Sequence, residues 1–147
     1  MKDIAQNKKA YHDYLIEAKY EAGISLVGSE IKSLRQGKVS LKEAYVAFVH
    51  GEALIKSMSI SEYKDASYNN HEETRERRLL LHKREINKLA AKCKIQGYTC
   101  IPLKIYFNDA GKVKMEIALA KGKTLYDKRM SDKALSMERA AKSAMKR

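Results

Sequence analysis

The sequence predicts a mainly β fold, in which an antiparallel barrel carries two to three peripheral α-helices and is followed by a basic C-terminal tail. Three observations support this. The 147 residues suffice for one compact domain with a tail. Several short segments alternate apolar and polar residues with the period of a β-strand. The alternation stops after Leu119, and the remainder is rich in Lys and Arg. We therefore expect a barrel over residues 1–120 and a tail over residues 121–147.

In the first half of the chain, residues 14–21 alternate and predict a strand. Between residues 24 and 36 the apolar spacing changes to that of a helix, which Gly37 is placed to end. Residues 43–49 and 52–60 predict two strands joined by a turn at His50 and Gly51. The polar, aperiodic segment 61–74 predicts a loop.

In the second half, an apolar stripe predicts a helix from Leu79 to Ile95, ended by Gly97. Two strands follow, over residues 101–107 and 113–119, joined by a short hairpin loop. Pro102 cannot donate a backbone hydrogen bond, so we expect its strand to lie at a sheet edge. Five or more antiparallel strands interrupted by two helices are typical of an OB-like fold, a frequent RNA-binding scaffold.

Positive charge is concentrated in two parts of the chain. Thirty Lys and Arg against 18 Asp and Glu give a net charge of +12. Residues 75–94 and residues 121–147 each contribute +6 of this. Clustered charge of this kind favours a polyanionic partner, because neutralising phosphates releases condensed counterions. The tail has too few aliphatic residues to offset its ordering entropy, so we expect it to be disordered when free.

Several other classes of protein do not fit the sequence. No apolar stretch approaches a membrane span, and the polar start is unlike a secretory signal peptide, so we expect a cytoplasmic protein without a membrane partner. Two cysteines, Cys93 and Cys100, offer no disulfide framework. The four histidines show no metal-ligand spacing, so neither a metal nor a cofactor is expected. Gly122-Lys123-Thr124 is not a phosphate-binding loop, because Ile117 stands where such a loop needs its first glycine.

The aromatic residues and histidines leave two alternatives open. Tyr14, Tyr20 and Tyr106 are expected to half-fill the barrel, whereas Tyr126, among the basic residues of the tail, is better suited to stacking on RNA. A general tRNA- or rRNA-binding OB-fold protein is one alternative. A small ribonuclease that uses His12 and His82 as acid and base is the other, from a different class.

Four long segments carry a resemblance to a known family. They are "NKKAYHDYLIEAKYEAGISLVGSEIKSLRQGKVSLKEAYV" (7–46), "HEETRERRLLLHKREINKL" (71–89), "GYTCIPLKIYF" (97–107) and "KMEIALAKGKTLYDKR" (114–129). In this order they resemble the SsrA-binding protein family, also called small protein B, over nearly the whole chain. The resemblance implies an OB-like barrel, monomeric and without enzymatic activity. It further implies binding to the tRNA-like domain of transfer-messenger RNA (SsrA) and delivery of that RNA to stalled 70S ribosomes for trans-translation.

The resemblance also implies two sets of site residues. Those matching positions that support binding of transfer-messenger RNA are Glu21, Arg35, Lys38, Tyr45, Leu80, His82 and Lys114. Those expected to face the small ribosomal subunit near its decoding centre are His12, Lys121, Lys123, Tyr126, Asp127, Lys128 and Arg129. In this family the tail becomes helical in the empty messenger channel.

This chain departs from the family pattern in the predicted loop. Relatives commonly carry prolines where this chain has "SISEY" (59–63) and "EETR" (72–75), so we expect a more mobile segment at residues 59–74. Position 126 is Tyr where many relatives have His, which preserves stacking but removes a protonatable ring.

Overall fold

The computed structural model describes residues 2–63 and 70–123. Within these residues, nine strands and three helices follow one another along the chain. Their bounds are β1 Lys2–Gln6, α1 Lys8–Asp13, β2 Tyr14–Ile24, α2 Gly28–Arg35, β3 Val39–Ser40, β4 Tyr45–Val49, β5 Glu52–Lys56, β6 Ser59–Ile60, β7 Arg77–Leu80, α3 Lys83–Cys93, β8 Tyr98–Phe107 and β9 Val113–Gly122.

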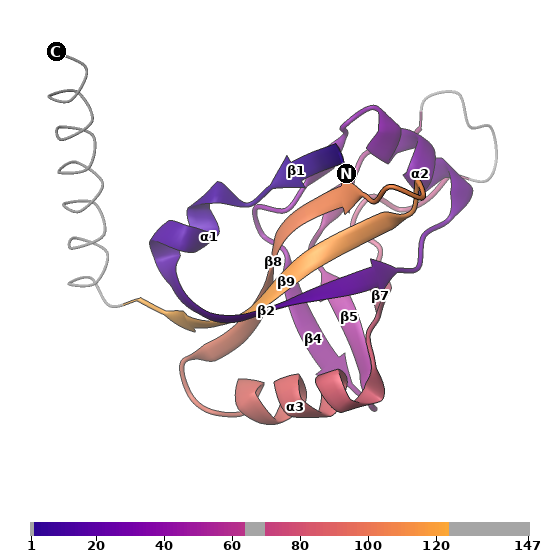
Figure 1. Ribbon diagram of the computed structural model, residues 1–147. Helices are drawn as coiled ribbons and strands as arrows, with labels where there is room; N and C mark the ends of the chain where they lie inside the picture. Colours follow the sequence, from indigo (N-terminus) through magenta and orange to yellow (C-terminus); the bar gives the residue numbers. More distant parts are fainter. Residues whose placement is uncertain (1, 64–69, 124–147) are drawn as a thin grey trace, which may run out of the picture.

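The main sheet of the described residues closes on itself. Its antiparallel strands follow the order β1-β8-β4-β5-β7-β2-β9, and β9 also pairs with β8, so the strands from β8 to β9 form a ring. Figure 1 shows α2 and α3 at opposite ends of this ring and α1 outside it. The predicted mainly β, OB-like architecture with peripheral helices is confirmed.

Two hydrophobic clusters hold the described part of the chain together. The main core fills the inside of the ring and includes Ile55, Leu79, Leu89 and Ile105, each almost fully buried. A second, smaller cluster lies under α1 on the outer face of β8 and β9. Its buried members are Ala10, Ile101, Leu103, Ala118 and Ala120. The chain therefore uses both faces of β8 and β9, which explains why these strands are apolar almost throughout.

Both predicted helices begin later than expected. Residues 77–80 form β7, and α3 begins only at Lys83. Leu79 is 1% exposed and Leu80 is 53% exposed, which is the alternation of a strand with one buried face. Likewise Ile24 is the last residue of β2, and α2 begins at Gly28. In each case the apolar residues at the end of a strand have, over a few positions, the same spacing as the apolar stripe of a helix.

Two predictions about strands need correction. Segment 52–60 is not one strand, because Ser57 has a φ of 60° and separates β5 from β6. The edge position expected for Pro102 holds only locally, because β8 as a whole pairs with β1, β4 and β9, whereas Pro102 itself has a strand partner only on the β9 side. A register shift between Pro102 and Lys104 accommodates the missing N–H. No periodic pattern predicted β1 or α1, which are polar and short.

Part of the predicted 61–74 loop is anchored. Residues 61–63 and 70–74 contain no helix or strand, as expected. His71, however, is buried, and its ring nitrogens lie 2.8 Å from the Ser29 hydroxyl and 2.8 Å from the Ile60 carbonyl oxygen. Residues 64–69 lie outside the described part of the chain. The expected mobility of residues 59–74 therefore does not apply to the segment around His71.

A buried ion pair joins α2 to β7. The side chains of Glu30 and Arg77 are both fully buried, and Arg77 Nε donates to Glu30 Oε2. Arg77 also donates to the carbonyl oxygens of Met58 at 2.8 Å and Glu73 at 3.1 Å. Glu30 Oε1 accepts from Arg75 at 2.5 Å and from the Val27 N–H at 2.9 Å. Both oxygens of the buried Glu30 carboxylate thus accept hydrogen bonds, which compensates the loss of their hydration.

Burial and hydrogen bonding shift the pKa in opposite directions at both Glu30 and Arg77. Burial raises the pKa of Glu30, but hydrogen bonds from Arg75, the Val27 N–H and Arg77 more than offset it, so that this pKa lies below its ordinary value. Burial lowers the pKa of Arg77, and Glu30 counteracts that effect. The pair is charged across the physiological pH range, and its stabilising effect depends on both charges.

Replacing Glu30 by Gln should destabilise the protein strongly, because Arg77 would be left as an uncompensated buried charge. We expect a loss of about 3–5 kcal/mol in the free energy of unfolding, measured by urea denaturation. The exposed Glu62→Gln is the control and should change this free energy by less than about 0.5 kcal/mol.

The same ion pair predicts a pH dependence. Because the folded pKa of Glu30 lies below the unfolded value of about 4.3, its stabilisation is complete above that pH and is lost as the pH falls through the folded pKa. The wild-type curve of stability against pH should therefore fall more steeply below about pH 4 than that of Glu30→Gln. Parallel curves would contradict the assignment.

Candidate nucleic-acid interface

Four residues from four neighbouring strands form a line across the outer face of the sheet, which we call the outer row. Gly23 of β2 pairs with Leu80 of β7 on one side and with Lys114 of β9 on the other, and Lys114 pairs in turn with Tyr106 of β8. The outer row is thus Leu80, Gly23, Lys114 and Tyr106. Leu80 is 53% exposed, an unusual degree for a leucine within a sheet.

Gly23 allows the two neighbouring side chains to approach one another. A Cβ atom at this position would lie 3.2 Å from Leu80 Cβ and 3.6 Å from Lys114 Nζ. The Lys114 ammonium therefore lies above the glycine, next to the exposed Leu80. An apolar surface and a positive charge side by side are what a nucleotide requires, since its base is flat and its phosphate is anionic.

Glu21 lies beside the outer row and is held by Tyr106. The Tyr106 hydroxyl donates a hydrogen bond to Glu21 Oε2. Tyr106 is only 3% exposed, and burial raises its pKa above the ordinary value, as do the hydrogen bond to Glu21 and the carboxylates of Glu116 and Asp3. Tyr106 therefore remains a donor at neutral pH and fixes one carboxylate oxygen of the exposed Glu21. The other oxygen can accept a hydrogen bond from a partner.

The structure brings together some of the expected RNA-binding residues and separates others. Glu21, Leu80 and Lys114 are at or beside the outer row, and the exposed His82 follows Leu80 immediately before α3. Glu85 Oε1 accepts from the His82 N–H at 3.1 Å, which fixes the start of the helix. Arg35 ends α2 and Lys38 follows the turn at Gly37, so neither belongs to the strands of the row.

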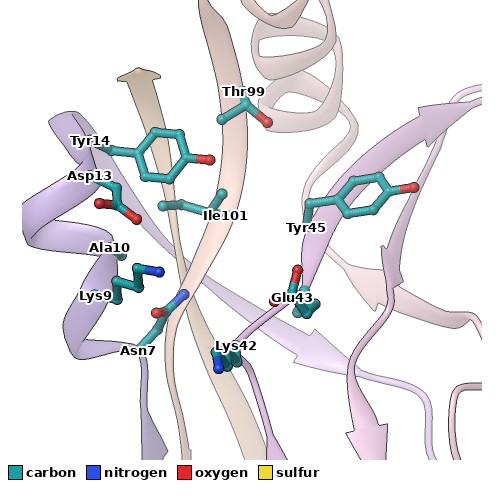
Figure 2. Close-up of a pocket in the computed structure, with 11 residues that line it drawn as sticks. Asn7, Lys9, Ala10, Asp13, Tyr14, Lys42, Glu43, Tyr45, Thr99 and Ile101 are labelled. Carbon is teal, nitrogen blue, oxygen red and sulfur yellow. The ribbon is translucent and has the colours of Figure 1, made fainter. Parts of the chain in front are cut away.

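Tyr45 also lies away from the outer row. It begins β4, pairs with Lys56 of β5 and is 43% exposed. Figure 2 shows it beside a cleft of about 370 Å³ between α1 and the start of β4. The expected RNA-binding residues therefore occupy more than one surface.

The residues expected to face the ribosome lie at the other end of β2 and β9. Tyr14 pairs with Gly122 there, whereas Gly23 pairs with Lys114 at the outer row. The nine steps along the strand from Tyr14 to Gly23 span roughly 30 Å at about 3.3 Å per residue. His12, Lys121 and Lys123 are all found at this far end. Tyr126, Asp127, Lys128 and Arg129 lie outside the described residues.

Contacts with α1 hold the end of β9 in place. The Lys123 N–H donates to the Asp13 carbonyl oxygen at 2.9 Å, and Lys123 Nζ donates to the Tyr11 carbonyl oxygen at 3.0 Å. His12 Nδ1 lies 3.0 Å from Asp13 Oδ1, and Lys121 Nζ lies 5.8 Å from the centre of the Tyr98 ring. The chain thus leaves the sheet at a defined point beside α1 (Figure 1).

The same distance separates the two histidines of the ribonuclease alternative. His12 precedes Tyr14 at one end of β2, and His82 follows the strand that pairs with the other end. An acid and a base that act on one phosphodiester must both reach it directly or through one water molecule. The structure does not bring these two histidines together.

Tyr106 is the residue at this interface that the sequence analysis misassigned. It was expected to half-fill the barrel, but Ile105, its neighbour, faces the main core, and Tyr106 lies in the outer row. Its alternation with Ile105 was a usable signal, because successive strand residues face opposite sides. The register shift between Pro102 and Lys104 puts Leu103 in the outer cluster instead.

Among residues 2–63 and 70–123, no group of three or more His, Cys, Asp or Glu side chains is arranged to hold a metal ion. No helix in the same residues is long and apolar enough to cross a membrane.

Comparison with known proteins gives consistent matches over the whole chain. The family described as SmpB protein matches residues 4–147. An SsrA-binding protein of a Nitratiruptor species is 54% identical over 149 residues, covering 99% of this chain and 98% of that protein. One from Syntrophobacter fumaroxidans is 56% identical over 130 residues, covering 88% of this chain and 80% of its own length.

A solved structure agrees with these relatives. It is described as "tmRNA-SmpB: a journey to the center of the bacterial ribosome". Its matching chain is 45% identical, with a TM-score of 0.69, and the match covers 82% of this chain and 85% of that one. The similarity therefore extends to fold as well as sequence.

A larger residue at Gly23 should disrupt the outer row. Gly23→Val would place side-chain atoms against Leu80 Cβ and Lys114 Nζ, and we expect a loss of about 1–3 kcal/mol in the free energy of unfolding from overpacking. Gly122→Val is a matched control, since that strand glycine has nothing within 4 Å of an added Cβ. If both variants are as stable as the wild type, Leu80 and Lys114 do not approach Gly23 closely enough to exclude a side chain there.

Proposed function

Since this chain belongs to the SmpB protein family, we propose that it binds the tRNA-like domain of transfer-messenger RNA and delivers that RNA to stalled ribosomes for trans-translation. The observation that carries the proposal is the outer row, where Leu80, Lys114 and the neighbouring Glu21 come together from three separate strands. These residues form an exposed patch suited to a nucleotide.

The outer row divides RNA binding among its side chains. Lys114 meets a backbone phosphate, and the exposed Leu80 packs against the face of an unstacked base. Glu21, with one oxygen held by Tyr106, accepts a hydrogen bond from a ribose 2′-hydroxyl or a base amino group. His82 lies two residues beyond Leu80 and contacts the same RNA. Arg35, Lys38 and Tyr45 contact the RNA backbone and bases outside the row.

The far end of β2 and β9 faces the small ribosomal subunit near its decoding centre. His12, Lys121 and Lys123 are roughly 30 Å from the outer row, so the protein can contact both RNA molecules at once. Tyr126, Asp127, Lys128 and Arg129 extend this contact along the chain, and the rest of the tail enters the messenger channel. The protein acts as a monomer in the cytoplasm and performs no chemistry itself.

Replacing Lys114 by Ala should weaken binding of the tRNA-like domain, because one phosphate contact is lost. In a plot of log K against log salt concentration, the slope should fall in magnitude by about one unit. Lys92→Ala, an exposed lysine on α3, is the control and should leave the slope within experimental error. An unchanged slope in Lys114→Ala would remove that residue from the interface.

Removing the tail should separate RNA binding from ribosomal function. Because β9 continues to Gly122 and Lys123 bonds to α1, the truncation is best made after Lys123. We expect affinity for the tRNA-like domain to stay within about threefold, and tagging of stalled products to be abolished, in a reconstituted translation assay. A truncated protein that supports normal tagging but no longer binds RNA would contradict the proposal that the barrel binds RNA and the tail acts on the ribosome.

A further inference from the structure

The ladder of hydrogen bonds along β8 has a gap on one side. β8 pairs with β4 at Cys100 and with β1 from Lys104 onward, which leaves Ile101 to Leu103 without a strand partner on that side. Pro102, at the centre of the gap, has no N–H to satisfy. Asn7 covers part of it, because its N–H donates to the Leu103 carbonyl oxygen at 2.7 Å and its amide donates to the Pro102 carbonyl oxygen at 3.2 Å.

The cleft between α1 and β4 opens at this gap (Figure 2). Lys9 and Tyr14 lie on the α1 side, Lys42 and Glu43 lie on the opposite side just before β4, and Ile101 and Thr99 come from β8. The cavity of about 370 Å³ is at the lower end of the range for small ligands, roughly 300–1,000 Å³. It has room for one nucleotide, and not for a double helix.

Three charged side chains of the cleft are available to a ligand. Lys9, Lys42 and Glu43 are all exposed, and none has an ion pair or a side-chain hydrogen bond within residues 2–63 and 70–123. Tyr14 is half-buried, with its hydroxyl directed across the cleft (Figure 2). Asp13, whose Oδ1 lies 3.0 Å from His12 Nδ1, also lines the cleft, so two cations, two carboxylates and a phenol ring surround a space of nucleotide size.

These groups match the parts of a nucleotide one by one. Lysine ammonium groups bind phosphate, and the half-buried ring of Tyr14 offers a surface for a base. A carboxylate accepts hydrogen bonds from the amino group of adenine, cytosine or guanine, which uracil lacks. A nucleoside triphosphate fits poorly, because the carboxylate would repel its charge and no glycine-rich loop cradles it.

We propose that the α1–β4 cleft binds one unpaired nucleotide of RNA, with its phosphate at Lys9 and Lys42 and the amino group of its base at Glu43. The inference rests on the proposed function, which supplies RNA as the partner, and it adds a binding site separate from the outer row. It also gives a role to Tyr45, whose exposed ring points away from Tyr14 at the edge of the cleft and takes the adjacent base (Figure 2).

The double variant Lys9→Gln/Lys42→Gln tests the phosphate contact in the full-length chain. Lys88→Gln/Lys92→Gln, on exposed positions of α3, removes the same charge elsewhere and is the matched control. Affinities are measured for two RNA partners, the isolated tRNA-like domain and the small ribosomal subunit. We expect the cleft variant to bind one partner about tenfold more weakly than the control does.

The partner affected identifies the source of the nucleotide. Weaker binding of the tRNA-like domain places the nucleotide in transfer-messenger RNA, and weaker binding of the subunit alone places it in ribosomal RNA. If the cleft variant and the α3 control bind both partners equally well, the proposal is overturned. Circular dichroism and urea denaturation establish that both double variants are folded.

Competition with RNA hexamers tests the base contact. Hexa-adenylate should displace the labelled RNA partner that the cleft double variant affects several-fold better than hexa-uridylate does, and Glu43→Ala should remove this preference. An adenylate preference that persists in Glu43→Ala, or is absent from the wild type, overturns the role of Glu43. Lys114→Ala should keep the adenylate preference. A result that refutes the cleft proposal therefore differs from one that refutes the role of the outer row.

Discussion

The arrangement of the surface proposed to face RNA depends on the buried ion pair between Glu30 and Arg77. Arg77 opens β7, and its side chain is bound on one side by α2 and on the other by carbonyl oxygens of the segments before β7. Leu80 lies three residues further along the same strand and pairs with Gly23. A short strand has little apolar area of its own, so the ion pair fixes the register that puts Leu80 beside Lys114. Buried charges are costly, and the best explanation for this pair is that it specifies a single register of β7.

The long β2–β9 ladder then sets the distance between the two proposed RNA-contacting surfaces. One end carries the outer row, and the other carries α1 and the point where the chain leaves the sheet. Antiparallel pairing over the length of the ladder, with one register shift between Ile16 and Ala18, makes it stiff, whereas a flexible linker would let the surfaces move independently. A protein that must contact two RNA molecules at defined positions benefits from such a spacer. The cleft beside α1 would add a third contact, at the α1 end of the ladder.

Local patterns predicted the strands well, because a strand with one buried face alternates in sequence, as residues 14–21 and 113–119 do. They failed at Leu79-Leu80-Leu81, where three leucines suit a strand or a helix, and at β1 and α1, which are too polar to show a period. The Glu30–Arg77 contact joins residues 47 positions apart and has no local signal. The site residues came from the family resemblance. The cleft could not be predicted from the sequence, because it depends on a gap in strand pairing that only the fold creates.

The central claim is that this surface recognises a tRNA-like RNA and not tRNA in general. A protein can recognise that part of an RNA is absent. If it occupies the place of an anticodon arm, it collides with an RNA that has the complete arm. The direct measurement is the affinity of the full-length protein for the tRNA-like domain of transfer-messenger RNA and for an elongator tRNA, at the same salt concentration. We expect the tRNA-like domain to bind at least tenfold more tightly. Equal affinities would contradict the account and favour a general tRNA-binding protein.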